Sequence, residues 1–229
     1  MKLKNKLRIF LCCFLFPLAC NGNNIKVVIF DCGGFTIDHN PLIQSYVKHF
    51  KIKRKITSLE NKGVMQFLKE DLRVPMWKIV LHSSKLLSMS EDHIIKTKFF
   101  ADVKTTLQKI SDMGYPIKVV TLVSKRKIEK KLEQEGLSKM VEHVSAGSLI
   151  GSFLNRKNIM KKYLKKNKLS PGAVLYIGDD VGKIQKYRKI GLQVCGISWG
   201  LNSKEGIKQI KPNFLIDKPE ELLEILQKV

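Results

Sequence analysis

The chain has 229 residues, of which 44% are hydrophobic and 27% are charged, and its formal net charge is +22. This composition is typical of one globular domain, with room for a small insert, and it excludes an intrinsically disordered chain. The lysines recur along most of the expected helices, which favours a bias of solvated surfaces over a nucleic-acid footprint. The positive charge would still attract anionic substrates or an anionic membrane surface, and the sequence has no specific nucleic-acid motif.

The first twenty residues have the pattern of an export signal. A positively charged start precedes the apolar run Ile9–Ala19, which is shorter than the roughly 20 residues that span a bilayer. Cys20 follows a small residue and resembles the lipidated cysteine of a bacterial lipoprotein, but Pro17 stands where that signal usually has leucine. A lipidated and a simply cleaved signal are both open. We expect an exported protein, either periplasmic or anchored to the membrane through a lipid on Cys20.

Two segments near the start predict a strand and then a helical insert. The segment Lys26–Phe30, apolar after its first residue, predicts a buried strand that ends at Asp31. The segment Asn40–Lys98 has apolar residues at helical spacing, and we expect it to form a small helical cap inserted after this strand. The core domain would then consist of residues 21–39 and 99–229.

Strands and helices alternate through the rest of the chain. The expected strands are Pro116–Thr121, Val141–Ser145, Ala173–Ile177, Leu192–Ser198 and Phe214–Ile216. The expected helices between them are Ala101–Met113, Lys127–Glu135, Asn158–Lys166 and Val181–Ile190, and Asp217 is expected to cap a last helix. Such alternation predicts an α/β fold, with a Rossmann-like parallel sheet that has helices on both faces.

Polar residues stand where these strands end or where the next helix begins, and parallel sheets bind ligands at that edge. In chain order they are Asp31, Thr121, Lys157 and the pair Asp179 and Asp180. A carboxylate can attack phosphorus, a hydroxyl and an ammonium can hold phosphoryl oxygens, and further carboxylates can bind Mg²⁺. Each residue alone is a weak signal, because a strand-end aspartate can equally cap a helix, so the prediction depends on their order.

The segments that carry these residues resemble the haloacid dehalogenase (HAD) superfamily of hydrolases, in its phosphoglycolate phosphatase-like branch. They include VVIFDCGGFTID, FFADVKTTLQKISDMGYPIKVVTLVS and RKNIMKKYLKKNKLSPGAVLYIGDD, and the resemblance continues in the C-terminal part from GLQVCGISWG onward. The resemblance implies that Asp31 is a nucleophile that forms an aspartyl phosphate and that Thr121 and Lys157 bind phosphate. It also implies a small phosphorylated metabolite as substrate.

The same resemblance implies Mg²⁺ as a cofactor. Its ligands would be Asp31, the backbone carbonyl of Gly33, and Asp179. Asp180 could be a further ligand, and it could equally be only the N-cap of the following helix.

Two positions depart from the family pattern. Gly33 stands where the phosphatases carry the aspartate that serves as general acid and base, and Lys183 stands where the last motif often has a second aspartate. A general acid contributes roughly 10²–10⁴-fold to a rate, so we expect slow hydrolysis or hydrolysis restricted to good leaving groups. A lysine in place of an aspartate should also weaken the binding of Mg²⁺.

Three functions are therefore compatible with the sequence. The first is an exported HAD-like phosphatase with an altered mechanism. The second is a catalytically inactive relative that binds a phosphorylated ligand or a partner. The third is a dehalogenase-type hydrolase that acts on a carbon–halogen bond, since those members also lack the second aspartate.

Overall fold

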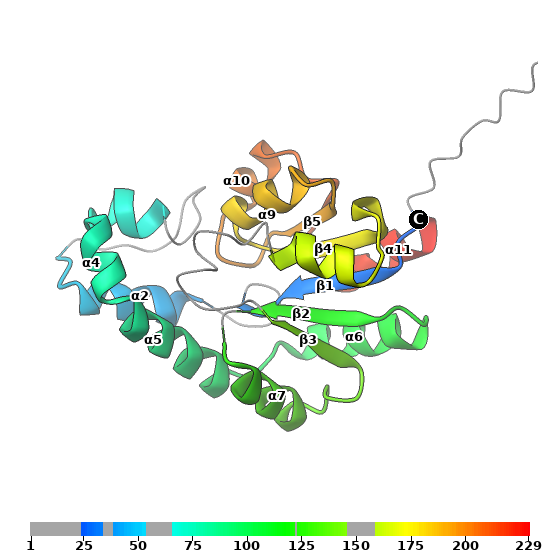
Figure 1. Cartoon of the computed structure of the whole chain (residues 1–229), viewed down its shortest axis with the longest axis horizontal. Helices are drawn as coiled ribbons and strands as arrows, with labels where there is room; N and C mark the ends of the chain where they lie inside the picture. Colours follow the sequence, from blue (N-terminus) through cyan, green and yellow to red (C-terminus); the bar gives the residue numbers. More distant parts are fainter. Residues whose placement is uncertain (1–23, 34–38, 54–65, 122, 146–158) are drawn as a thin grey trace, which may run out of the picture.

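The computed structural model describes residues 24–33, 39–53, 66–121, 123–145 and 159–229 (Figure 1). The expected export signal, Cys20 and Lys157 lie outside these described residues.

A parallel sheet of six strands organises the molecule. The strands are β1 (Val27–Asp31), β2 (Ile117–Thr121), β3 (Val141–Ser145), β4 (Val174–Gly178), β5 (Gln193–Ile197) and β6 (Phe214–Ile216). Their order in the sheet is β3-β2-β1-β4-β5-β6, and every pairing is parallel. The predicted Rossmann-like parallel sheet is confirmed. β1 lies between β2 and β4, so the end of β1 is flanked by the ends of both neighbouring strands.

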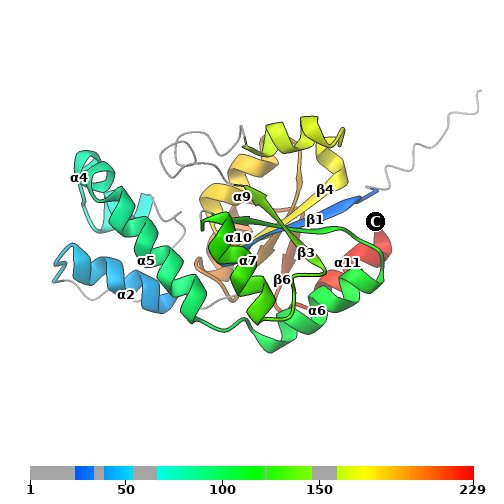
Figure 2. The ribbon, with the colours of Figure 1, turned by 60° about the horizontal axis from the view of Figure 1, so that its bottom comes forward.

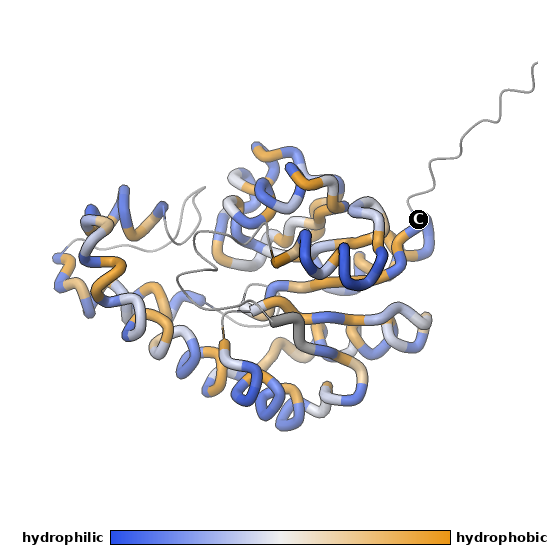
Figure 3. Tube along the Cα trace, viewed as in Figure 1, coloured by the Kyte–Doolittle hydropathy of each residue, from blue (hydrophilic) through white to orange (hydrophobic). Residues whose placement is uncertain are grey.

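Helices cover both faces of this sheet (Figures 1 and 2). One face carries α6 (Ala101–Asp112), α7 (Lys125–Gln134) and α11 (Glu221–Lys228). The other face carries α9 (Val181–Arg188), α10 (Lys204–Gln209) and a helix over residues 159–166. Hydrophilic and hydrophobic residues alternate along these helices, whereas the strands are mostly hydrophobic (Figure 3).

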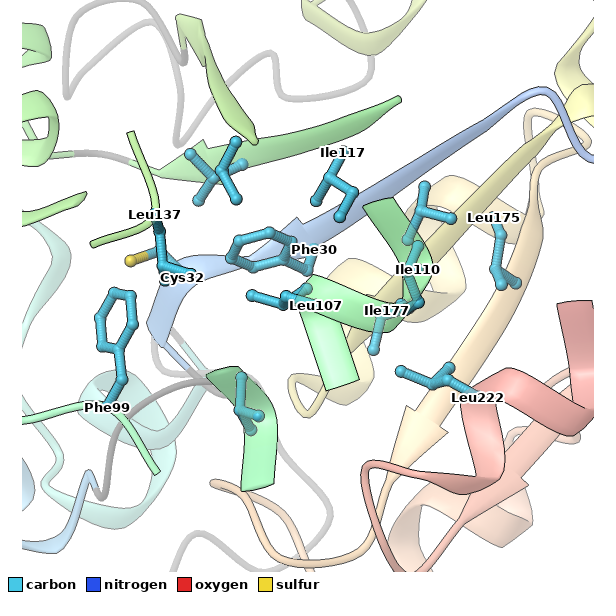
Figure 4. Packing of buried hydrophobic residues seen from close by; sticks show 14 of the residues in the cluster. Phe30, Cys32, Phe99, Leu107, Ile110, Ile117, Leu137, Leu175, Ile177 and Leu222 are labelled. Atoms are coloured by element: carbon cyan, nitrogen blue, oxygen red, sulfur yellow. The ribbon is translucent and has the colours of Figure 1, made fainter. Parts of the chain in front are cut away.

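The alternation of side chains along β1 divides the core in two. Val28 and Phe30 point to the face of α6, α7 and α11, and Val27 and Ile29 point to the face of α9 and α10. Figure 4 shows Phe30 beside Leu107 of α6 in the first of these clusters. Each fully buried side chain of this size stabilises the fold by roughly 1.5–3 kcal/mol, so β1 is held firmly from both sides.

The predicted insert is helical in its described parts. It contains α2 (Asn40–His49), a π-helical turn η1 (Phe67–Asp71), α4 (Met76–Leu81) and α5 (Ser83–Lys96). These elements share a hydrophobic cluster of their own, which also includes Leu201 from the loop after β5. They lie beyond the end of the sheet to which the strands point (Figure 1). None of the helices in the described ranges is long and apolar enough to cross a membrane.

The predicted cap of the last helix is wrong. Asp217 does not cap α11. Its carboxylate lies 2.5 Å from the Lys204 ammonium of α10, and the opposite charge of this lysine draws it away from the helix end. The Glu221 carboxylate instead reaches back and accepts the backbone N–H groups of Asp217 and Lys218, at 3.1 and 2.9 Å. The other predicted boundaries that fall on described residues agree with the structure to within one or two residues, whereas Asn158, the expected start of a helix, lies outside those residues.

Candidate active site

Asp31 is the centre of the site. It is the last residue of β1 and is only 5% exposed. Two donors from the neighbouring part of the fold meet its Oδ2 atom: the Tyr176 hydroxyl of β4, at 3.2 Å, and the Lys183 ammonium of α9. A buried carboxylate is costly unless it is paired and hydrogen-bonded, and these two contacts meet that requirement.

Asp179 follows β4 directly and is almost fully buried. Its Oδ2 atom accepts the backbone N–H of Leu201 at 2.6 Å. Burial, and then the charge of the Asp31 carboxylate, raise the pKa of Asp179 to about 7, although the Lys183 ammonium opposes the shift. Gly200 allows this arrangement, because a Cβ at that position would overlap the Cβ of Asp179.

Asp180 is the N-cap of α9. Its Oδ1 atom accepts the backbone N–H of Lys183 at 2.9 Å, and Asn202 accepts the N–H of Val181 at the same distance. Of the two roles that the sequence left open for Asp180, the structure shows the cap. The cap fixes the first turn of α9, and this turn carries the Lys183 ammonium toward Asp31.

Thr121 ends β2 at the same edge of the sheet. The register pairs Val120 with Asp31, so Thr121 lies next to the site along the neighbouring strand. Its side chain is buried, and its Oγ1 atom accepts the backbone N–H of Val123 at 3.2 Å. The structure thus brings Asp31, Thr121, Asp179 and Asp180 to one edge, whereas the predicted phosphate ligand Lys157 lies outside the described residues.

His39 is the residue of this site that the sequence analysis did not identify. A Cβ built on Gly33 would lie 2.6 Å from Nε2 and 2.7 Å from Cε1 of the His39 ring, and 3.9 Å from Oδ1 of Asp31. The imidazole therefore occupies the space that a side chain at position 33 would need. The available signal was a histidine just before the first helix of the insert, at the end of the segment that begins with the nucleophile.

The Mg²⁺ ligands implied by the sequence are not arranged as a metal site. The described residues include no group of three or more histidine, cysteine, aspartate or glutamate side chains that could hold a metal ion. Each of the three carboxylates already binds another group of the protein. Asp31 is paired with the Lys183 ammonium, Asp180 accepts a backbone N–H of its own helix, and Asp179 accepts the N–H of Leu201. This donor set, with an ammonium among the carboxylates, does not fit a divalent cation.

Two relatives similar in sequence over most of the chain are phosphatases by name. The chain is 21% identical over 207 residues to a phosphoglycolate phosphatase of Synechococcus elongatus, a match that covers 87% of this chain and 96% of the relative. It is 24% identical over 213 residues to the pyrophosphatase PpaX of Bacillus mycoides, covering 90% and 98%. Both relatives match almost the whole of their own length, so the similarity includes the helical insert.

A solved structure described as a predicted phosphatase from Clostridium acetobutylicum has the same fold. It superposes with a TM-score of 0.74 at 16% identity, covering 90% of this chain and 99% of the other. The family model described as haloacid dehalogenase-like hydrolase matches residues 28–197, about three quarters of the chain. This match includes β1 from its second residue, β2 to β5, and every described residue of the site except Gly200, Leu201 and Asn202. The chain belongs to the haloacid dehalogenase-like hydrolase family.

Proposed function

We propose that the protein hydrolyses a small phosphorylated substrate through an aspartyl-phosphate intermediate on Asp31. One Oδ atom of Asp31 would form a bond to phosphorus, while the bond from phosphorus to the leaving oxygen breaks and that oxygen takes up a proton. Water would then hydrolyse the acyl phosphate, releasing phosphate and restoring the carboxylate. The observation that carries this proposal is the buried Asp31 carboxylate at the end of a central parallel strand, next to a lysine ammonium.

Lys183 supplies positive charge at the point where a phosphoryl group would arrive. Its ammonium is bound to Asp31 and comes from the first turn of α9. A phosphoryl group on Asp31 would bring its oxygens next to this ammonium, which would stabilise their charge in a partly desolvated site. Mg²⁺ would supply the same neutralisation in a metal-dependent member of the family, but the described residues do not fit it, and the proposal assigns this role to Lys183.

The substrate class follows from the relatives and from the charge of the chain. Relatives named for phosphoglycolate and for pyrophosphate support a small phosphorylated molecule. The formal net charge of +22 would attract such an anion. The helical segment made by α2, α4 and α5 lies beyond the strand ends, and we assign it as the cap that selects the substrate.

Export is a further part of the proposal. The apolar run before Cys20 supports a protein that leaves the cytoplasm, with or without a lipid on that cysteine. Fractionation of cells that produce the full chain tests this point. Recovery of the protein in the cytoplasm at its full length would contradict it.

The catalytic proposal is tested with an aryl phosphate and an alkyl phosphate, each with Mg²⁺ and with EDTA. The purified protein should release phosphate, and acid quenching should trap a phosphorylated protein. Asp31→Asn should abolish both, whereas Asp112→Asn, an equal change at an exposed position of α6, should leave them unchanged. Binding of phosphate esters without turnover would indicate a ligand-binding protein instead, and chloride release from a 2-haloacid would indicate a dehalogenase.

A further inference from the structure

The space above Gly33 is filled by an imidazole from another element. The family pattern to which the first segment is similar implies an aspartate at the position of Gly33, and here no side chain is present. We propose that His39 replaces this aspartate as the proton donor to the leaving group and as the proton acceptor from water. The inference rests on the proposed aspartyl-phosphate mechanism and assigns its missing acid and base.

The distances place the imidazole at the Cβ position of residue 33, within the reach of an aspartate side chain there. In an aspartate the carboxylate oxygens are two bonds beyond Cβ, at about 2.4 Å from it. The Nε2 atom of His39 lies 2.6 Å from the Cβ position of residue 33, which is nearly the same distance. This Cβ position is in turn 3.9 Å from Oδ1 of Asp31, the carboxylate oxygen that does not bind Lys183. The ring thus lies on the Gly33 side of the nucleophile.

His39 is held in place from the side of the helical segment. Its carbonyl accepts the backbone N–H of Ile43 at 3.1 Å, which fixes it at the start of α2. Its ring packs against His93 of α5, with 5.8 Å between the ring centroids, and the Nδ1 atom of His93 lies 3.4 Å from the Thr97 hydroxyl. The proposed acid is therefore carried by the insert, while the nucleophile is carried by the sheet.

Histidine is suited to both proton transfers. An imidazolium would give a proton to the leaving oxygen as its bond to phosphorus breaks, and the neutral imidazole would then take a proton from the water that attacks the aspartyl phosphate. The second transfer restores the imidazolium, so the cycle balances. Because the ordinary pKa of histidine is close to neutral, one side chain can serve in both directions.

The alternative is a role in packing alone, in which the His39 ring only fills the space above Gly33. The two roles differ in how the rate depends on the leaving group. A general acid matters most when the leaving oxygen is strongly basic, and it matters little when the leaving group is a good one. A ring that only fills space would affect both kinds of ester alike.

The test measures single-turnover formation of the acid-trapped phosphoenzyme, using a series of aryl and alkyl phosphates of rising leaving-group pKa. Relative to wild type, His39→Ala and His39→Gln should slow the reaction of alkyl phosphates by about 100-fold or more and that of activated aryl phosphates by less than about threefold. His49→Ala, in the last turn of the same helix, is the matched control and should keep the wild-type dependence.

A carboxylic acid placed at residue 33 should restore the rate that is lost in His39→Ala. Gly33→Asp combined with His39→Ala places a carboxylate in the vacated space and should recover most of the rate on alkyl phosphates. An unchanged leaving-group dependence in both His39 variants, or no recovery in the double variant, would overturn the role of His39 while leaving the nucleophile in place. Absence of any phosphoenzyme from the wild-type protein would overturn the role of His39 together with the proposed function.

Discussion

The Lys183 ammonium of α9 forms a hydrogen-bonded ion pair with the Asp31 carboxylate of β1. The two residues are 152 positions apart in the chain, and the parallel pairing of β1 with β4 brings them together, since α9 begins just after β4. The N-cap bond from Lys183 N–H to Asp180 fixes the turn from which the ammonium extends. One positive charge therefore stands among three acidic side chains at the edge of the sheet.

Replacing this charge should create a site for Mg²⁺. In Lys183→Asp a carboxylate replaces the ammonium, which changes the local charge by two units and leaves Asp31 open to a metal. We expect Mg²⁺ to bind at least about tenfold more tightly than to the wild-type protein, as measured by isothermal titration calorimetry. Lys186→Asp makes the same charge change at an exposed position of α9 and is the control. Equal Mg²⁺ affinities of the two variants would contradict this reading of Lys183.

Asp179 should make the folded protein less stable at high pH. The pKa of this carboxyl is about 7 in the folded protein and near its ordinary 3.8 when unfolded, so the folded state binds the proton more tightly. The free energy of unfolding should therefore fall as the pH rises from about 4 to 7, and the whole penalty is present above pH 7. Asparagine avoids this penalty and can still accept the N–H of Leu201.

We expect Asp179→Asn to be more stable than the wild-type protein by roughly 1–3 kcal/mol at pH 8, with a smaller difference at pH 5. Urea unfolding at the two pH values measures this. Asp112→Asn, which changes an exposed aspartate in the same way, should show no such dependence on pH. A stability gain of Asp179→Asn that is equal at both values would show that the ionisation of Asp179 is not its cause.

The fold was predictable because its signals are local. The buried runs before Asp31 and Asp179 and the alternation with amphipathic helices define a parallel sheet before any contact is known. Parallel strands in turn fix which residues share an edge, so the meeting of Asp31, Thr121 and Asp179 could also be anticipated. In these cases the periodicity of the strand determines the position of the side chain.

The other features of the site depend on contacts between distant segments. The position of His39 above Gly33 depends on the path of the chain from β1 to α2, on which a hydrophobic pattern gives no information. The loss of the cap at Asp217 depends on Lys204, thirteen residues away. The ion pair of Lys183 with Asp31 depends on the N-cap of α9, which sets the direction of the first turn of that helix.

Glu91 joins the helical segment to the core and should matter for stability. It is a buried residue of α5, and its Oε1 atom accepts the backbone N–H of Ser124 at 2.9 Å, just before α7, while Oε2 pairs with Lys127. Burial alone would raise the pKa of Glu91, but the bonds from Lys127 and Ser124 outweigh it and hold the pKa below its usual value. The ionised Glu91 carboxylate therefore stabilises the folded protein at pH values above its ordinary pKa, and this stabilisation is lost as the pH falls below it.

Glu91→Ala leaves the Ser124 N–H without this acceptor and should lower the free energy of unfolding at pH 7 by about 1–3 kcal/mol. Thermal unfolding compared with Glu129→Ala, an exposed glutamate of α7, measures the effect. The difference between the two variants should shrink as the pH is lowered below 4.5, the ordinary pKa of this carboxyl. Equal unfolding temperatures at pH 7 would show that the contact between α5 and α7 does not contribute to stability.

Gly200 should be essential to the position of Asp179. A Cβ at residue 200 would overlap the Cβ of Asp179. Because a Cβ is bonded directly to the backbone, no change of rotamer can move it away. Gly200→Ala must therefore push the loop after β5 away from the loop after β4, which lengthens the 2.6 Å bond from Leu201 N–H to Asp179. We expect a loss of roughly 1–3 kcal/mol in stability and at least about tenfold in phosphatase activity.

Gly172→Ala is the matched control, because a Cβ there meets no atom within 4 Å. Wild-type activity and stability in Gly200→Ala would show that the two loops tolerate a shift, and that the close approach of Gly200 to Asp179 is not needed for the site.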